Sequence, residues 1–301
     1  MIIFQNIMKL QTYKLKQSIN TFDIKSYIMK QKTTELREQL LFLEESEERL
    51  KILKNQYKDD TAYIIAGGPS LNNYSMEYLR EVLKDELVIS IKQSYEPLKS
   101  VTDFHVLNFT NYKPYDWSNN RSIVTWAIFE QFHPQMIFDN NLTCDLMIPI
   151  YRNNPNTGGG VGPDKMSFSV AELGDFELLK LDHPEVGFNQ PWAPGIMYEM
   201  CIPLAIYTGC KKIVTIGWDI GDINSFQNGK EDDTQRVFQD HFYGNQHEQI
   251  VYAKTSMGPR EITSVANSTK GMYYWLKEQG IEWEMVSDRN PGYEGIPRIT
   301  L

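Results

Sequence analysis

The chain has 301 residues, of which 41% are hydrophobic and 23% are charged, a composition typical of a globular protein with a sizeable core. Its formal net charge of −9 argues against a general electrostatic attraction to nucleic acid or to anionic lipid. Three cysteines without a CxxC pair indicate neither a disulfide framework nor a structural zinc site, and no apolar run approaches the roughly 20 residues of a membrane span. We therefore expect a soluble, cytoplasmic protein that binds no nucleic acid.

The charge is distributed unevenly along the chain. Residues 1–56 carry 10 Lys or Arg and 7 Asp or Glu, a balance of +3, whereas residues 57–301 have a balance of −12. Residues 33–55 contain no Gly or Pro, and their leucines recur at helical spacing, which predicts one helix there. We expect residues 1–58 to form a helical extension. It is a candidate for contact with a second subunit of a homo-oligomer, or for peripheral approach to the inner face of a membrane.

Residues 59–301 are predicted to form one main domain with an α/β fold. Pro203, inside the second of its predicted helices, is expected to kink that helix or to mark its first turn. The alternation of strands and helices favours a doubly wound, mainly parallel sheet, interrupted by a polar insertion at about residues 220–260. Apolar runs of strand length cover residues 62–66, 87–91, 104–107, 122–129, 145–151, 212–216 and 282–286, and helical patterns cover residues 75–84, 194–207 and 263–279.

The first predicted strand ends in the turn AGGPSL at residues 66–71. Gly67 and Gly68 allow backbone N–H groups to approach a ligand closely, and Pro69 restricts the turn. Ser70 can cap the following helix or donate to a phosphate oxygen. The turn is neither a P-loop nor a GxGxxG motif. These residues alone leave two equal interpretations, an anion-binding turn and a plain strand-to-helix turn.

A second candidate site follows the predicted strand at residues 212–216, in the sequence GWD. In an open α/β sheet, a carboxylate just past the end of a parallel strand faces the crevice where ligands bind. Asp219 is therefore a candidate site residue. The alternative is a loop aspartate that accepts hydrogen bonds from backbone amides. Trp218, beside it, offers a surface on which a sugar or base could stack, although core packing is the more frequent use of tryptophan.

The order of these motifs resembles the bacterial sialyltransferases of glycosyltransferase family 42, and also the related motility-accessory-factor and hydroxymethylpterin-pyrophosphokinase-like proteins. The similarity lies in the strand ending in GGPSL, followed about 125 residues later by a helix that begins with PG and a strand that ends in GWD. It covers roughly residues 61–110 and 190–290. The resemblance implies a Rossmann-like, GT-A-like fold and an inverting glycosyltransferase that needs no metal or other cofactor. Its donor would be a CMP-activated sialic acid, another nonulosonic acid or Kdo, and its acceptor a glycan, lipid or protein.

The resemblance also assigns roles to individual residues. It places Asn108 against the donor, Gly195 at the start of the helix that faces the donor sugar, and Asp219 at the cytidine end. Lys92 stands where the sialyltransferases have an asparagine, which agrees better with the accessory-factor branch, and it would supply positive charge. Ser287 matches the serine that follows the last strand. The residues expected against the nucleotide phosphate are Gly67, Gly68, Pro69 and Ser70.

Inverting sugar transfer needs a base that takes a proton from the acceptor hydroxyl. In the sialyltransferases this base is a histidine of a mobile segment, which makes His241 and His247 the candidates within the predicted lid at residues 220–260. Tyr243 or Tyr252 would hold the leaving phosphate. The alternative is that these histidines are simply solvated, and their spacing matches no standard metal site. The remaining histidines, His105, His133 and His183, are expected to be structural.

Two other functions compete with a glycosyltransferase. A pyrophosphokinase of the hydroxymethylpterin type would need ATP and Mg²⁺, with Asp219 and Asp222 as the available carboxylate pair. A non-catalytic nucleotide-sugar-binding protein, whose N-terminal helix recruits a partner, is the other possibility. It is motivated by positions at which this sequence differs from the donor-contacting residues of the sialyltransferases, such as Lys92 in place of an asparagine.

Overall fold

The fold is described from a computed structural model. It describes residues 21–43, 45–108, 115–118, 121–129, 137, 142–151, 177–180, 186–189, 196–219, 259–287, 290 and 292–301, with side chains for all of these except residues 21–23, 46, 69 and 259–268. Within this part of the chain, no helix is both long enough and apolar enough to cross a membrane.

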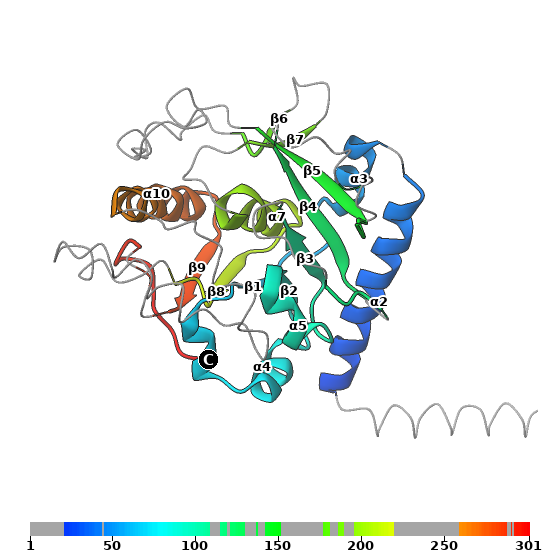
Figure 1. The fold of residues 1–301 in the computed structure, drawn as a ribbon, viewed down its shortest axis with the longest axis horizontal. Coiled ribbons are helices and arrows are strands. Elements are labelled where there is room, and N and C mark those ends of the chain that lie inside the picture. The colour runs from blue at the N-terminus through cyan, green and yellow to red at the C-terminus, as the bar shows by residue number, and fades with distance from the viewer. Residues whose placement is uncertain are drawn as a thin grey trace, which may run out of the picture.

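In the described residues, nine strands form a single sheet in the order β6-β7-β5-β4-β3-β2-β1-β8-β9 (Figure 1). All neighbouring strands are parallel except β6 and β7, which pair antiparallel. The sheet therefore confirms the predicted Rossmann-like α/β fold with a mainly parallel sheet. The strands are β1 (Thr61–Ile65), β2 (Leu87–Ile91), β3 (Phe104–Leu107), β4 (Ile123–Phe129), β5 (Leu146–Tyr151), β6 (Leu179–Lys180), β7 (Gly187–Asn189), β8 (Lys212–Ile216) and β9 (Glu282–Val286).

The strand order has one switch point. From β1 the chain adds strands outward on one side through β2, β3, β4 and β5, and it later returns to place β8 and β9 on the other side of β1. The chain therefore leaves the adjacent strands β1 and β8 toward opposite sides of the sheet, and in open parallel sheets such a switch point is where ligands bind.

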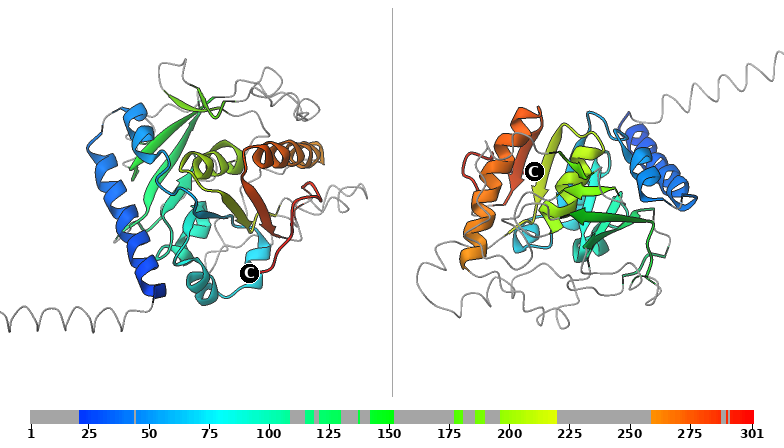
Figure 2. Two further views of the ribbon diagram at one scale, coloured as in Figure 1. Left: turned by 180° about the vertical axis from the view of Figure 1, so that it is seen from behind. Right: turned by 90° about the horizontal axis from the view of Figure 1, so that it is seen from above.

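Helices and single-turn segments cover both faces of the sheet (Figures 1 and 2). Because side chains alternate along a strand, Ile64 of β1 packs into the core cluster that includes α2, α3, α7 and α10, while Ile65 packs into the one that includes α4. The helical elements are α2 (Thr21–Leu41), α3 (Ser46–Leu53), η1 (Pro69–Asn73), α4 (Met76–Leu83), η2 (Lys92–Ser94), α5 (Tyr95–Leu98), η5 (Met197–Cys201), α7 (Ile202–Tyr207) and α10 (Pro259–Glu278).

The prediction of one helix over residues 33–55 is wrong. The chain forms α2 and α3 with a break between them, where the Leu43 carbonyl accepts hydrogen bonds from Nε and Nη2 of Arg49 at 2.9 and 2.6 Å. Glu47 and Glu48 lie in the first turn of α3, where negative charge stabilises a helix start. The charged residues at 44–48 that interrupt the leucine pattern therefore mark a new helix start within the predicted helix.

The expectation for Pro203 is confirmed, because it lies in the first turn of α7. Proline has no N–H to donate to the Glu199 carbonyl four residues earlier, so the regular α-helical bond is missing there. The preceding residues Met197–Cys201 form a π-helical turn, η5, instead. This wider turn carries Glu199, whose side chain is only 2% exposed.

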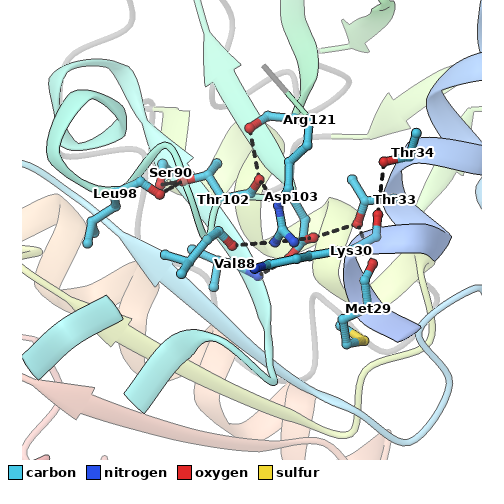
Figure 3. A network of polar contacts seen from close by, with 12 residues as sticks. Met29, Lys30, Thr33, Thr34, Val88, Ser90, Leu98, Thr102, Asp103 and Arg121 are labelled. Carbon is cyan, nitrogen blue, oxygen red and sulfur yellow. Dashed lines mark hydrogen bonds and ion pairs between the residues drawn. The ribbon is translucent and has the colours of Figure 1, made fainter. Parts of the chain in front are cut away.

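A buried carboxylate at the amino end of β3 anchors α2 to the sheet (Figure 3). Asp103 is fully buried, and its Oδ1 accepts hydrogen bonds from the Thr33 hydroxyl of α2 and from Arg121 Nη2 at 2.9 Å. Its Oδ2 accepts from the Val88 N–H of β2 at 2.9 Å. Burial raises the pKa of the Asp103 carboxyl, an effect that Arg121 and the hydrogen bonds oppose. The network joins α2, β2 and the amino ends of β3 and β4.

A second aspartate repeats this arrangement one helical turn farther along α2. Asp145, just before β5, accepts a hydrogen bond from Arg37 Nε at 2.9 Å and another from the Val124 N–H at 2.8 Å, both through Oδ2. Because Thr33 and Arg37 are four residues apart, they face the sheet together. The helix α2 is thus fixed to the edge of the sheet opposite its carboxyl ends.

We expect Thr33→Val to lower the free energy of unfolding by about 2 kcal/mol, because it removes a hydrogen bond to a buried carboxylate while keeping the side-chain shape. Thr34→Val is the matched control. Thr34 is exposed, and among the described residues it donates to the Lys30 carbonyl of its own helix. Thr34→Val should therefore lower the free energy of unfolding by less than about 0.5 kcal/mol. Urea denaturation of both variants is the measurement, and equal losses would contradict the role given to Asp103.

Candidate functional site

The candidate site lies where the carboxyl ends of five neighbouring parallel strands meet. The strand register aligns Ile65 of β1 with Ile216 of β8, and Ile216 with Val286 of β9. On the other side, Ser90 pairs with Ile65, and Ile91 pairs with Val106 of β3. The residues that follow these strands therefore share one edge of the sheet, and several of the residues predicted from the sequence are among them.

The turns after β1 and β8 touch through their backbones. The Gly68 N–H donates to the Gly217 carbonyl at 2.7 Å. A Cβ on Gly68 would lie 2.3 Å from that carbonyl oxygen, and Gly217 has a φ of +66°. Close backbone approach therefore requires both glycines. In this structure Gly68 approaches the neighbouring turn of the protein itself.

Asp219 binds the donors of two other strand ends. Its Oδ2 accepts from the Ser70 N–H at 2.6 Å, and its Oδ1 accepts from the Ser70 hydroxyl at 2.8 Å and from the Ser287 hydroxyl. The interpretation of Asp219 as a loop aspartate that accepts from a backbone amide thus describes what the structure shows. The Ser70 amide and hydroxyl, predicted to face a phosphate, donate to this carboxylate.

Gly67 and Lys92 lie on adjacent strand ends, β1 and β2. A Cβ on Gly67 would meet the side-chain amide of Gln93, the residue after Lys92, at 2.6 Å. Lys92 has a φ of +49°, in the left-handed region that a residue with a Cβ seldom adopts. Burial lowers the pKa of the Lys92 ammonium to about 8, against the opposing influence of the nearby Glu199 carboxylate. A strained, poorly solvated lysine therefore stands beside the glycine turn.

A histidine of β3 contacts the Lys92 backbone. Nε2 of the fully buried His105 lies 2.9 Å from the Lys92 carbonyl oxygen, and Trp117 Nε1 donates to His105 Nδ1 at 2.9 Å. The ring of Tyr95 stacks on the imidazole with a centroid separation of 4.0 Å. The expectation that His105 is structural agrees with this burial, but the sequence did not show that it holds the turn at Lys92.

Asn108 follows β3 and is 8% exposed. Its Oδ1 is buried and accepts no hydrogen bond in the described part of the chain. A buried acceptor without a donor costs about 1–3 kcal/mol, so such atoms are rare in folded proteins. Because Ile91 pairs with Val106, Asn108 and Lys92 end adjacent strands. The unpartnered amide oxygen therefore belongs to the residue that ends the strand next to the half-buried Lys92.

Trp218 packs against the protein core. Its ring stacks on Trp283 with centroids 5.9 Å apart, and the Tyr198 ring meets it edge-on at 5.1 Å. The Trp218 carbonyl accepts from Asn290 Nδ2 at 2.6 Å. Core packing, the alternative weighed for this residue, is thus what the described contacts show.

Several predicted site residues fall outside the described residues. These are both candidate bases, both candidate phosphate tyrosines, the helix-start glycine and most of the predicted lid, namely His241, His247, Tyr243, Tyr252, Gly195 and residues 220–258; Pro69 is described in its backbone only. The structure thus brings together Gly67, Gly68, Ser70, Lys92, Asn108 and Asp219 at one edge of the sheet.

The sequence did not predict four of the residues that make contacts at this edge, namely Gln93, Glu199, Trp117 and Asn290. Each depends on a partner distant in the chain, and none stands in a motif. Lys92 was singled out by its place in the resemblance, whereas its left-handed backbone had no glycine or asparagine to signal it.

Comparisons with known proteins add one structural similarity. A search of solved structures matches a MAf glycosyltransferase from Magnetospirillum magneticum AMB-1, with 13% identity over 64% of this chain and a TM-score of 0.31. The match covers 28% of that protein's chain. No protein-family model and no curated protein matches this sequence significantly. The assignment of the fold rests on the sheet order and register of this chain.

We expect Gly68→Ala to lower the free energy of unfolding by about 2–3 kcal/mol, because its Cβ would collide with the Gly217 carbonyl and the Asp219 carboxylate. Gly67→Ala is the control, since its Cβ would meet only the movable end of Gln93 and should cost less than about 1 kcal/mol. Chemical denaturation compares the two. A larger loss for Gly67→Ala would show that the contact between the β1 and β8 turns does not govern this edge.

Proposed function

We propose that the chain is an inverting glycosyltransferase that uses a CMP-activated acidic sugar, of the sialic acid, nonulosonic acid or Kdo type. The acceptor would be a glycan, a lipid-linked glycan or a protein. The reaction would need no metal, because Lys92 can balance charge on the leaving phosphate. The motif order in the sequence and the geometry at the carboxyl edge of the sheet are the two supports for this proposal.

The observation that carries the proposal is the pair formed by Lys92 and Asn108. In the described part of the chain, the Lys92 ammonium forms no ion pair or hydrogen bond with another side chain, and Asn108 Oδ1 has no donor. An ammonium binds a phosphate or carboxylate, while a buried amide oxygen needs an N–H or O–H donor. A ligand that satisfies both has an anionic group close to a hydroxyl or amino group. A nucleotide-activated acidic sugar has all of these.

The proposed chemistry is a single displacement. The acceptor hydroxyl oxygen attacks the anomeric carbon of the sugar, the bond from that carbon to the phosphate oxygen breaks, and CMP leaves with the bonding electrons. Lys92 would stabilise the negative charge that develops on the departing phosphate. The proton of the acceptor hydroxyl would go to His241 or His247 of the insertion at residues 220–260. Tyr243 or Tyr252 would donate to the leaving phosphate.

The Asp219 contacts define what Ser70 does in this proposal. Three donors already bind the Asp219 carboxylate, from Ser70 and Ser287. Asp219 would therefore fix the ends of β1, β8 and β9 relative to one another, beside the cytidine. A nucleotide phosphate that contacts the Ser70 amide would have to exchange with this carboxylate. The primary phosphate contact is accordingly assigned to Lys92.

We expect CMP at saturating concentration to raise the melting temperature of the wild-type protein. Lys92→Met and Asn108→Ala should each weaken CMP affinity about tenfold or more, because each removes a polar partner of the ligand. Lys58→Met, a change at an exposed lysine outside the site, is the matched control and should bind as the wild type does. Thermal shift and calorimetric titration measure these effects.

The same panel separates the competing functions. If CMP gave no shift and no CMP-sugar were hydrolysed, the glycosyltransferase proposal would be abandoned. Preference for ATP over CMP together with sensitivity to EDTA would identify a pyrophosphokinase. Binding of CMP-sugars without turnover of any donor or acceptor would identify a non-catalytic binding protein. His241→Ala and His247→Ala, made singly and together, test the base by its effect on turnover.

The affinity for CMP should depend on pH through Lys92. The protonated ammonium binds the phosphate, and the pKa of Lys92 is lowered to about 8 by burial, so affinity should fall as pH rises past about 8. A bound anion favours the charged ammonium, so the midpoint in the complex lies higher. Calorimetric titration between pH 7 and about 10 measures this, and Lys92→Met should remove the dependence. An unchanged pH profile in that variant would exclude Lys92 from phosphate binding.

A further inference from the structure

One buried ionisable group near the site has no role in the proposed reaction. His105 of β3 is fully buried between aromatic rings, with Tyr95 stacked on it at 4.0 Å and Tyr115 edge-on at 4.7 Å between centroids. Both ring nitrogens face polar groups of other segments, the Trp117 indole and the Lys92 carbonyl. The imidazole therefore links the segment after β3 to the turn after β2.

The donors in this chain of contacts determine which nitrogen carries the proton. An indole N–H can only donate, so His105 Nδ1 must accept the hydrogen bond from Trp117 and cannot itself be protonated. The ring proton is then on Nε2, which donates to the Lys92 carbonyl at 2.9 Å. If the ring were doubly protonated, the N–H at His105 Nδ1 would point at the N–H of the Trp117 indole, and no hydrogen bond could form between them. Trp117 thereby selects the tautomer that binds Lys92.

The Lys92 carbonyl receives two donors. The Tyr95 N–H closes the single turn η2 by donating to it, and the His105 Nε2–H donates to the same oxygen. These bonds hold the carbonyl direction at a residue whose φ of +49° is unfavourable for any side chain with a Cβ. Lysine has no intrinsic preference for this conformation, since glycine and asparagine are the residues that adopt it readily. External hydrogen bonds therefore support the strained turn.

We infer that His105 is a positioning residue: its Nε2–H, selected by Trp117, holds the Lys92 turn in the left-handed conformation that keeps the ammonium at the carboxyl edge, where an anionic ligand group binds. This inference rests on the proposed function only for the identity of that anion. The backbone of an unsupported lysine would relax toward ordinary φ values, and its long side chain would follow the turn toward water. The phosphate would then lose its cation without any change in a residue that touches it.

In the described part of the chain, the titratable groups near enough to act on the Lys92 ammonium come from another element, η5. They are the Glu199 carboxylate, which is 2% exposed, and the Cys201 thiol, which is fully buried. The Glu199 carboxylate favours the charged ammonium, whereas burial opposes it, and burial also raises the pKa of the Cys201 thiol, which therefore stays neutral while Lys92 titrates. Movement of Lys92 toward water would reduce the dominant effect of burial, so its pKa would rise toward the ordinary value for lysine. The pKa of Lys92 is thus a direct measure of its position.

Three variants separate the hydrogen bond from the packing. His105→Phe keeps a flat ring between Tyr95 and Tyr115 but removes the donor to Lys92. His105→Gln retains a side-chain N–H donor of comparable reach. Trp117→Phe leaves the imidazole in place but removes the hydrogen bond that selects its tautomer.

The primary measurement is the titration of Lys92 itself, without a ligand. Reductive methylation with ¹³C-formaldehyde gives an NMR signal for each lysine, and the Lys92 signal is assigned by its loss in Lys92→Arg. We expect His105→Phe to raise the Lys92 midpoint toward that of an exposed lysine, His105→Gln to restore the wild-type midpoint, and Trp117→Phe to lie between them. Urea denaturation of each variant establishes that it is folded. If His105→Phe does not fold, the test rests on the Lys92 midpoints of His105→Gln and Trp117→Phe.

The second measurement uses an anionic probe and a neutral one. His105→Phe should weaken inorganic pyrophosphate about tenfold, or about 1.4 kcal/mol, and leave cytidine affinity unchanged. His105→Gln should recover pyrophosphate affinity to within about twofold. Equal weakening of both probes would indicate general distortion and overturn the inference.

The two proposals fail in different ways. A Lys92 midpoint and a pyrophosphate affinity that are both unchanged in His105→Phe would overturn the positioning role, whatever the enzyme does. A shifted midpoint in a protein that binds neither pyrophosphate nor CMP would support His105 as the residue that holds the turn. That result would refute the proposed function and the proposed binding of an anion at Lys92.

Discussion

The contact between the β1 and β8 turns is the constraint on which the site depends. Adjacent parallel strands that belong to opposite halves of a sheet leave a crevice at their carboxyl ends. Here the ends of β1 and β8 are joined by the bond from the Gly68 N–H to the Gly217 carbonyl, and by Asp219, which binds Ser70 and Ser287. The protein's own carboxylate uses donors that could otherwise bind an anion. Among the described residues, one buried unpartnered acceptor, Asn108 Oδ1, lies at the carboxyl end of β3, two strands from β1.

The two edges of the sheet use buried charge in opposite ways. At the amino edge, Asp103 and Asp145 each accept from a side chain of α2 and from a backbone amide of a neighbouring strand. These carboxylates are paired and hydrogen-bonded, so they hold α2 in place without demanding a ligand. At the carboxyl edge, Lys92 is half-buried and its pKa is lowered by desolvation, and the buried Asn108 Oδ1 has no donor among the described residues. Arg121 Nη1, in the Asp103 network, also lacks an acceptor among the described residues, so unsatisfied groups occur at both edges of the sheet.

Most of the sheet could be predicted from the sequence because local patterns encode it. The apolar runs at residues 87–91, 104–107, 212–216 and 282–286 coincide with β2, β3, β8 and β9. The break between α2 and α3 was missed because the leucine spacing continues through it, while the acidic residues that start α3 look like an ordinary helix surface. The short strands β6 and β7 also escaped prediction, since two or three residues show no alternation.

The candidate site was predictable only in part, because its contacts are long-range. The sequence pointed to the glycine turn and to Asp219, yet 149 residues separate Asp219 from Ser70, and no local pattern shows that one binds the other. The hydrogen bond from His105 to Lys92 is similarly invisible, since a strand histidine reads as a core residue. The resemblance to glycosyltransferase sequences supplied Lys92 and Asn108, and the structure adds a physical reason to propose them as site residues.

That reason is that energetically unfavourable features of the backbone and of buried polar groups occur at two adjacent strand ends. Lys92 combines a left-handed backbone with a partly desolvated charge, and Asn108 buries an acceptor that has no donor among the described residues. Each feature opposes folding by an amount on the order of 1 kcal/mol or more. If an anionic ligand binds here as proposed, a body whose formal charge is −12 offers it little general attraction, so its affinity would come from a few groups that are held in unfavourable states without it. A ligand that supplied both a negative charge and a hydrogen-bond donor would relieve the two costs together, which makes the strain at this edge a source of affinity.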